Sequence, residues 1–188
     1  MQTTFHGLTF VSDPGRVFTP RQATERLVDI ALERIGDAPA RVADIGTGAG
    51  AVAVTLALRA PRIAVWASDT CGRALELAQV NAQRLGAQVH LVRGDLLEGL
   101  PRDLDLIVAN LPYLAPGTPG YEGEPPSAVF STGDGLDHYR RLLAIAGEHL
   151  VDDGGIVIQL RGDVLEAERS ELPWLLGRLE TLVHTLAA

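Results

Sequence analysis

Three features of the 188-residue sequence predict a doubly wound α/β fold with a mostly parallel sheet flanked by helices. Short, continuously apolar segments, such as 41–45 and 104–109, alternate with segments whose apolar residues recur at helical spacing. Apolar runs of this kind are typical of parallel strands that helices cover on both faces. Turn-forming glycines or prolines follow several of them, without repeats or low-complexity segments. A chain of this length fits one domain, and we expect residues 1–188 to form it.

The N-terminal elements are expected to be a hairpin and a helix. Residues 4–11 and 16–18 resemble the two strands of the hairpin, because Asp13-Pro14-Gly15 between them is typical of a turn. Residues 1–20 would then form the hairpin, and residues 21–188 the helix and the α/β core. An amphipathic helix ending at Gly36 is predicted by an apolar stripe of Leu27, Ile30, Ala31 and Ile35.

The remaining elements alternate as this fold class requires. Strands are predicted, in chain order, at residues 41–45, 63–68, 88–95, 104–109 and 155–160. Helices are predicted at residues 50–60, 71–86 and 136–150. A further helix is predicted at about 164–176, and 178–186 is interpreted as a last strand at a shortened C-terminal end.

Composition and charge narrow the class of protein. The chain is 46% hydrophobic and 21% charged, with a net charge of -8 and a pI near 5.0. An acidic chain is poorly suited to wide contact with nucleic-acid phosphates. No apolar run is long enough to cross a membrane and no signal peptide is visible, so a cytoplasmic protein is the default. The single cysteine excludes an internal disulfide, and the 5 histidines lack metal-ligand spacing.

Ligands of doubly wound sheets bind beyond the carboxyl ends of the strands, so the residues at those ends are the candidate site. The first strand is followed by DIGTGAGA, which places Asp44 ahead of Gly46, Gly48 and Gly50. Glycine permits a tight turn and a close approach of ligand to backbone, and the next helix offers free N–H groups. The G-x-G-x-x-A spacing also fits a dinucleotide, so a nicotinamide-dependent oxidoreductase stays open.

The next two strand ends each carry an aspartate. Asp69 is placed to accept hydrogen bonds from ribose hydroxyls, although capping the helix that begins near Cys71 would explain it almost as well. Asp95, in the turn GDLL, is placed to receive an exocyclic amine, and an exposed loop acid is the simpler alternative.

The fourth strand ends in Asn110-Leu111-Pro112-Tyr113. Pro112 forces Leu111 into an extended conformation, which fixes the direction of the Leu111 carbonyl. This carbonyl and the side-chain oxygen of Asn110 offer two acceptors for the hydrogens of one planar NH2 group. Tyr113 offers a ring face to a flat amide or base. The tetrapeptide therefore predicts a site that alkylates nitrogen, and the long loop 112–135 that follows favours a substrate-covering role.

The order DIGTGAG, SD, GDLL and NLPY resembles that of class I S-adenosyl-L-methionine-dependent methyltransferases that act on nitrogen. Within them the chain is most similar to the HemK/PrmC family, the protein-(glutamine-N5) methyltransferases of peptide-chain release factors. Two further segments carry this resemblance, namely GRVFTPRQATERLVDIAL at 15–32 and EPPSAVFSTGDGLDHYRRLL at 124–143.

The resemblance implies a Rossmann-like core, S-adenosyl-L-methionine as cofactor, S-adenosyl-L-homocysteine as product, a release factor as protein partner and no metal. It implies a cofactor site of Asp44, Gly46, Thr47, Gly48, Gly50, Asp69, Asp95, Leu96 and Asn110. It implies catalytic roles for Asn110, Pro112 and Tyr113, and a substrate site of Asn110, Leu111, Pro112, Tyr113 and Arg21. Arg21 would contact substrate or pair with Glu25 on the first helix, and pairing is the simpler interpretation.

Some residues depart from the family pattern. Leu111 stands where the family has proline, and Asn-Leu-Pro-Tyr is also typical of enzymes similar to rRNA adenine-N6 dimethyltransferases. A nucleic-acid adenine-N6 methyltransferase and a small-molecule N-methyltransferase are therefore alternatives. The family's N-terminal helical domain has no counterpart in these residues, and Gln159 stands where relatives usually have glutamate. A non-catalytic binding module is a further hypothesis.

Overall fold

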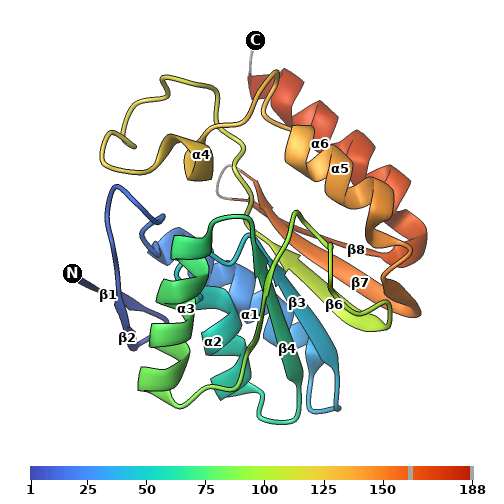
Figure 1. Cartoon of the computed structure of the whole chain (residues 1–188). Coiled ribbons are helices and arrows are strands. Elements are labelled where there is room, and N and C mark those ends of the chain that lie inside the picture. The colour runs from blue at the N-terminus through green and yellow to red at the C-terminus, as the bar shows by residue number, and fades with distance from the viewer. Residues whose placement is uncertain (161–162, 187–188) are drawn as a thin grey trace.

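A central sheet with helices on both faces forms the core of the computed structural model (Figure 1), which describes residues 1–160 and 163–186, without the side chains of 180–186. The strands are β1 Gln2–Phe5, β2 Leu8–Val11, β3 Arg41–Ile45, β4 Ala64–Asp69, β5 His90–Arg93, β6 Leu104–Ala109, β7 Leu150–Leu160 and β8 Asp163–Glu168. The helices are α1 Glu25–Ile35, α2 Ala51–Arg59, α3 Gly72–Leu85, α4 Pro126–Val129, α5 Asp137–Ala146 and α6 Leu172–Leu186.

The main sheet has six strands in the order β5-β4-β3-β6-β7-β8. Strands β3 to β7 are parallel to their neighbours, and β8 pairs antiparallel with β7. The chain runs outward from β3 to β5 on one side, and from β6 to β8 on the other. The strand order therefore reverses between β3 and β6, which is the point where ligands bind in open α/β sheets. The predicted doubly wound fold is confirmed.

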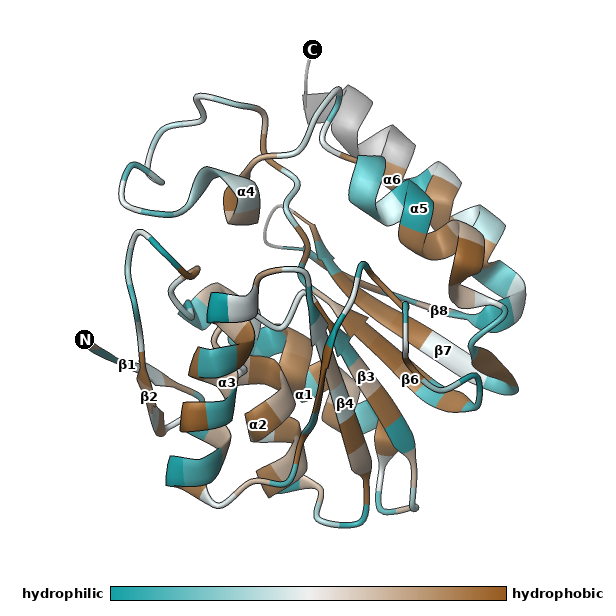
Figure 2. Ribbon diagram, in the orientation of Figure 1, coloured by the Kyte–Doolittle hydropathy of each residue, from teal (hydrophilic) through white to brown (hydrophobic). Residues whose placement is uncertain are grey.

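Figure 2 shows that much of the central sheet is hydrophobic where it lies between the helices. Successive residues of its strands point to opposite faces and belong to two cores. Val42 of β3 and Leu106 of β6 belong to the core beneath α1, α2 and α3. Their neighbours Ala43 and Ile107 belong to the core beneath α5 and α6. Both faces of the sheet are covered, which explains why the strands read as continuous apolar runs.

The N-terminal hairpin exists, but its predicted strands and turn are wrong. β1 and β2 pair from Gln2–Val11 to Phe5–Leu8, so the turn is His6-Gly7, with φ of 51° and 75°. Positive φ at both central residues is the geometry of the two-residue hairpin turn that best matches strand twist. Asp13-Pro14-Gly15 does form a turn, but it follows the hairpin, and residues 16–18 are not a strand.

The predictions for the C-terminal region are wrong as well. Residues 163–168 form β8 instead of a helix, because the outer edge of β7 pairs with them from Gly155–Glu168 to Leu160–Asp163. Tertiary pairing overrides their helical propensity. Residues 178–186 continue α6 instead of forming a strand. The helices predicted to end at Gly36 and Gly86 do so, with positive φ at both glycines.

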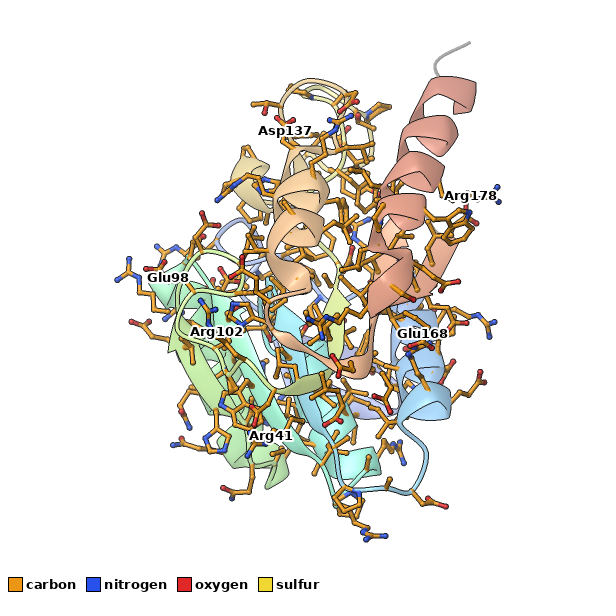
Figure 3. All side chains as sticks on the ribbon, turned by 90° about the vertical axis from the view of Figure 1, so that its right-hand side faces the viewer. Arg41, Glu98, Arg102, Asp137, Glu168 and Arg178 are labelled. Carbon is orange, nitrogen blue, oxygen red and sulfur yellow. The ribbon has the colours of Figure 1, made fainter. Side chains whose placement is uncertain are left out.

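Charged side chains cover the outer surface of the described part of the chain. Figure 3 shows those of Arg41, Glu98, Arg102, Asp137, Glu168 and Arg178 projecting away from the core. None of the described helices has the length and apolar character that crossing a bilayer requires. Within the same residues, no group of His, Cys, Asp and Glu side chains could hold a metal ion.

Candidate active site

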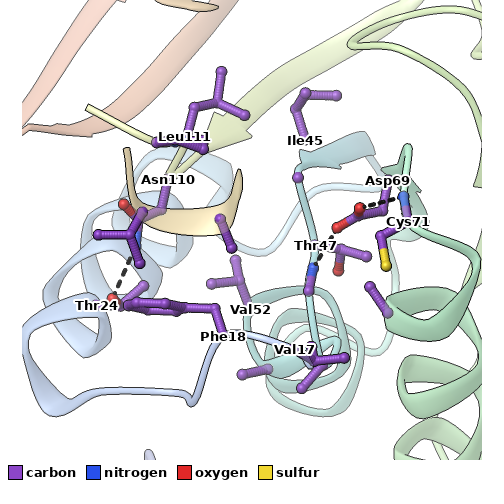
Figure 4. Close-up of a pocket in the computed structure, with 18 of the residues that line it drawn as sticks. Val17, Phe18, Thr24, Ile45, Thr47, Val52, Asp69, Cys71, Asn110 and Leu111 are labelled. Atoms are coloured by element: carbon purple, nitrogen blue, oxygen red, sulfur yellow. Dashed lines mark hydrogen bonds between the residues drawn. The ribbon is translucent and has the colours of Figure 1, made fainter. Parts of the chain in front are cut away.

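A cavity of about 260 Å³ lies at the carboxyl ends of the strands, where the strand order reverses. It is lined by every predicted site residue except Gly50. Figure 4 shows its two sides. We call one the acidic side, formed by Asp44, the turn Gly46–Gly48, Asp69, Asp95 and Leu96. We call the other the amide side, formed by Thr24, Asn110–Tyr113 and Gln159.

The glycine turn is fixed to the end of β4 by its backbone. The N–H groups of Gly46 and Thr47 both donate to the Ser68 carbonyl, at 2.9 and 3.0 Å. Gly46 and Gly48 have φ of 72° and 56°, which disfavours any side chain at these positions. Apart from its two chain neighbours, no described residue has an atom within 4 Å of the place that a Cβ on Gly48 would occupy. The turn therefore presents open backbone to the cavity.

Gly50 has a structural role that the sequence did not reveal. It precedes α2 with φ of 79°, and a Cβ there would lie 2.9 Å from the Ala78 Cβ. Gly50 does not line the cavity. What the structure assigns to Gly50 is close packing of the start of α2 against α3, and a role in binding a ligand stays a prediction. On the other side of this contact, the Asn81 amide of α3 donates to the Ala49 carbonyl at 2.9 Å and so holds the glycine turn.

Asp44 is almost fully buried below the turn. One of its oxygens accepts hydrogen bonds from the Thr47 hydroxyl at 2.7 Å and from the Ala53 N–H at 3.1 Å. Burial, with a smaller contribution from the nearby Asp69, raises the pKa of Asp44 to about 6 against the lowering effect of these two hydrogen bonds. Asp44 therefore ties the glycine turn to the first turn of α2.

Asp69 joins the turn to the start of α3. Its oxygens accept the N–H of Gly48 and the N–H of Cys71, both at 2.9 Å (Figure 4). The bond to Cys71 is a local turn ahead of α3, whose N-cap is Cys71 without a side-chain cap, so the capping alternative was wrong. The bond to Gly48 holds the same carboxylate at the cavity wall, and its binding of ribose hydroxyls stays a prediction.

Asp95 and Leu96 differ from each other in their surroundings. The exposed Asp95 carboxylate forms an ion pair with Arg141 of α5, which turns it toward that helix. Leu96 is buried with φ of 54°, an uncommon backbone conformation for a leucine. The Ser68 hydroxyl donates to its carbonyl at 2.7 Å and fixes the conformation.

On the amide side, Asn110 contacts Thr24 and Leu111 contacts Tyr139, whose hydroxyl also lies 3.5 Å from the Leu111 carbonyl oxygen, and the acceptor role of the two oxygens stays a prediction. The NH2 group of Asn110 donates to the Thr24 hydroxyl at 3.1 Å (Figure 4). Its Oδ1 accepts no hydrogen bond from the residues that the structure describes. The buried Tyr139 hydroxyl accepts the Leu111 N–H at 3.1 Å and donates to the Gln159 carbonyl. Burial raises the pKa of Tyr139, so the hydroxyl stays protonated and ties the ends of β6 and β7 together.

The two sides contact each other through Leu111. A Cβ on Gly46 would lie 2.8 Å from Leu111 Cδ2, so the leucine side chain packs directly on the glycine turn. The loop behind the tetrapeptide is closed in a similar way. A Cβ on Gly135 would lie 2.3 Å from the Tyr113 carbonyl oxygen, so only glycine allows the end of the loop to return to this point.

Arg21 does not pair with Glu25 on the first helix, and that interpretation was wrong. Its guanidinium lies 3.3 Å from the Glu124 carboxylate and 4.5 Å from the centre of the Tyr121 ring. Glu25 instead accepts the His6 N–H at 2.8 Å. Arg21 therefore fastens the 112–135 loop to the segment before α1, because it lies ahead of the helix instead of on it.

Three residues that support the tetrapeptide, two of them on the amide side and Tyr139 behind it, were not singled out for this role by the sequence. Thr24 contacts Asn110, Tyr139 contacts Leu111, and Gln159 donates from Nε2 to the Ala23 carbonyl at 3.2 Å. Oε1 of Gln159 is buried with no hydrogen-bond partner among the described residues. No local pattern identifies these contacts, because each joins segments far apart in the chain.

Comparison with known proteins shows the protein family to which this chain belongs. The family model "Methyltransferase small domain" matches residues 7–120. The chain therefore belongs to the methyltransferase small domain family, and the dinucleotide interpretation of the glycine turn loses its support.

Named relatives agree with the resemblance seen in the motifs. The chain is 41% identical over 164 residues to a release factor glutamine methyltransferase of Bordetella pertussis, with 83% of this chain and 61% of the relative covered. It is 38% identical over 178 residues to the one of Deinococcus radiodurans, with 89% and 63% covered. The chain thus spans about three fifths of the length of these relatives.

Solved structures share the fold. The ribosomal protein L11 methylase of Lactobacillus delbrueckii subsp. bulgaricus matches with a TM-score of 0.58 and 27% identity, over 78% of this chain and 63% of that one. The 16S rRNA N2 G1207 methyltransferase of T. thermophilus matches with a TM-score of 0.62 over 84% of this chain and 40% of that one. Its identity of 17% supports the fold alone.

Proposed function

We propose that the chain is an S-adenosyl-L-methionine-dependent N-methyltransferase that methylates a glutamine side-chain amide of a peptide-chain release factor. The observation that carries the proposal is the open Oδ1 of Asn110 beside the Leu111 carbonyl, opposite the acidic side of one cavity. The curated relatives at about 40% identity, which are release factor glutamine methyltransferases, support this acceptor.

The acidic side fits the proposed cofactor. S-adenosyl-L-methionine, when bound, supplies a methyl group already activated on a sulfonium cation. The carboxylates of Asp44 and Asp69 favour a cationic ligand, and Asp69 also offers acceptor oxygens for hydroxyl groups. The open backbone at Gly48 leaves space for a ligand. In this proposal Asp95 would receive the adenine amine after separating from Arg141.

The amide side would hold the acceptor. The oxygens of Asn110 and Leu111 accept the two N–H groups of a primary amide, which orients its nitrogen and concentrates electron density on it. Tyr113 and Pro112 line the same wall, and the fixed extended conformation at Leu111 keeps its carbonyl in place. Orientation is the main contribution of these residues, because the methyl donor is already reactive.

The test offers S-adenosyl-L-methionine with a labelled methyl group to the chain together with one acceptor at a time. The acceptors are a release factor, a Gly-Gly-Gln peptide, a matched Gly-Gly-Glu peptide, rRNA, DNA and a panel of amines. We expect one methyl group on the glutamine of the release factor, none on the Glu peptide and none with Asn110→Ala. Label on rRNA or DNA alone would overturn the proposal in favour of an adenine-N6 methyltransferase, which Leu111 in Asn-Leu-Pro-Tyr suggests.

Two other results would also contradict it. Label on a small amine alone would indicate a small-molecule methyltransferase. Binding of the cofactor without transfer to any acceptor would indicate a binding module. Cofactor binding is measured separately by calorimetry, so that these results are distinguished from a misfolded preparation.

A further inference from the structure

The side-chain amide of Asn110 has two ends of similar shape and opposite chemistry. Only its oxygen can accept an N–H group, so a rotation of the amide by half a turn would present donors to the acceptor nitrogen. The NH2 end donates to the Thr24 hydroxyl at 3.1 Å, and this is the one hydrogen bond of the Asn110 side chain within the described residues. The orientation of the amide therefore depends on Thr24.

Thr24 lies at a position where a threonine side chain normally caps the helix that follows it. It occupies the N-cap position of α1, where a hydroxyl usually accepts an N–H of the first helical turn. Thr24 makes no such bond, and its φ of -87° and ψ of -9° are already helical. Its side chain is buried, lines the cavity and contacts Asn110 across a sequence separation of 86 residues. The hydroxyl is therefore available to the amide.

The segment that carries Thr24 is held in place from several directions. The Gln159 amide at the end of β7 donates to the Ala23 carbonyl at 3.2 Å. The Thr24 N–H donates to the Arg21 carbonyl at 2.9 Å, and Arg21 is itself paired with Glu124. The ends of β6 and β7 thus bind adjacent residues of one short segment. A hydroxyl on such a segment holds the plane of the amide that it contacts, and in the structure it accepts from the NH2 end, which leaves Oδ1 free.

We propose that Thr24 is a positioning residue that holds the Asn110 amide with Oδ1 directed at the acceptor nitrogen, an inference that rests on the proposed N-methyltransferase function. Loss of the hydroxyl frees the amide to rotate, so that part of the molecules present NH2 instead of oxygen. The acidic side lies across the cavity and makes no hydrogen bond to Thr24 among the described residues, so cofactor affinity stays unchanged.

The experiment compares Thr24→Val, which keeps the shape and removes the hydroxyl, with Thr24→Ser, which keeps the hydroxyl. Thr55→Val is the matched control, because Thr55 is a buried threonine whose hydroxyl bonds the Ala51 carbonyl inside α2, away from the cavity. We expect kcat of Thr24→Val to fall about tenfold, the value for one lost hydrogen bond, with unchanged cofactor Kd. Thr24→Ser should recover kcat to within about threefold, and Thr55→Val should lower stability alone.

A second readout needs neither cofactor nor acceptor. The NMR signals of the Asn110 side-chain NH2 group, assigned by their loss in Asn110→Ala, report its hydrogen bond directly. We expect slow hydrogen exchange of this group in the wild-type chain and in Thr24→Ser, and fast exchange in Thr24→Val. If no acceptor is methylated by the wild-type chain, the proposed function fails, and this NMR comparison still decides the placement of the amide.

Two results would overturn the role of Thr24. One is unchanged exchange of the Asn110 NH2 group in Thr24→Val. The other is a loss of kcat in Thr24→Ser as large as in Thr24→Val, which would assign the effect to packing instead of to the hydroxyl. Thermal unfolding of each variant shows whether it is folded, and cofactor Kd gives the same check at the site.

Discussion

The two sides of the cavity are built in different ways. On the acidic side the hydrogen bonds of the glycine turn lie within the unit β3-α2-β4, from Thr47 and Asp44, three residues apart, to Gly48 and Asp69, 21 residues apart. On the amide side they join distant segments. Asn110 contacts Thr24 across 86 residues, and Gln159 reaches the Ala23 carbonyl across 136.

This difference has a consequence for stability and function. A turn whose hydrogen bonds lie within one strand-helix-strand unit needs only that unit to be packed. The hydrogen bonds of the amide side join segments far apart in the sequence, so the amide side forms only after the whole domain has packed. We therefore expect distant substitutions to disturb acceptor use before they disturb cofactor binding.

The largest effects are expected from one substitution on each side of the cavity, because each should impair a different step, cofactor binding or methyl transfer. Asp69→Ala removes a carboxylate that accepts two N–H groups, and we expect cofactor affinity to fall about 10- to 100-fold. Asn110→Ala should lower methyl transfer about 10²- to 10³-fold, with cofactor affinity within about threefold of wild type. Calorimetry and initial rates measure both. Asp153→Ala, at an exposed position of β7, is the control. Equal losses in both assays from either variant would contradict a division into two sides.

The next largest effect comes from Gly46, where the two sides touch. Gly46→Ala would place a Cβ 2.8 Å from Leu111 Cδ2 at a φ of 72°, and we expect unfolding free energy to fall by about 1–3 kcal/mol. Cofactor binding and methyl transfer should both weaken. Gly86→Ala is the control, because Gly86 has a similar φ of 75° and, beyond its chain neighbours, no atom of the described part of the chain lies within 4 Å of the new Cβ. Urea unfolding of both variants measures the difference, and equal losses would rule out the contact with Leu111 as the cause.

A smaller effect is expected from the hydroxyl that joins the ends of β6 and β7. Tyr139→Phe keeps the ring and leaves the buried Leu111 N–H without its partner, at an expected loss of about 1–2 kcal/mol in unfolding free energy. We also expect a lower kcat with unchanged cofactor Kd, because the Leu111 carbonyl belongs to the amide side. If the folded variant is less stable but its kcat is unchanged, Tyr139 contributes to stability and not to methyl transfer.

The smallest effect depends on pH and concerns the acidic side alone. Burial raises the pKa of Asp44 to about 6, so the folded chain binds this proton more tightly than the unfolded chain. This contribution to stability is present below about pH 4 and is lost as pH rises through about 6. A cationic cofactor needs the ionised form, so its affinity should weaken several-fold between about pH 7 and pH 5. Calorimetry across this range should show that cofactor affinity depends less on pH in Asp44→Asn than in the wild-type chain. Identical pH dependence in both would exclude Asp44 as the group whose ionisation controls this affinity.

The sequence alone predicted the parts of the molecule that depend on neighbouring residues. The glycine turn with Asp44 and the strand end at Asn110 were placed correctly at the cavity, because a strand, a turn and a helix follow one another without interruption. The hairpin turn was missed, because His6-Gly7 carries a weaker signal than Asp13-Pro14-Gly15. The stretch 163–168 was predicted as a helix, because only the open edge of β7 makes it a strand.

The sequence by itself determined the doubly wound fold, the residues at the strand ends and the resemblance to nitrogen methyltransferases. Each of these follows from spacing and residue type over short distances. Only the tertiary structure decided which groups hold those residues in place. It assigned Arg21 to Glu124 instead of Glu25, and Thr24 to Asn110 instead of its own helix. A hydroxyl or a guanidinium binds whatever the packed chain brings within about 3 Å, and its position in the sequence does not specify that partner.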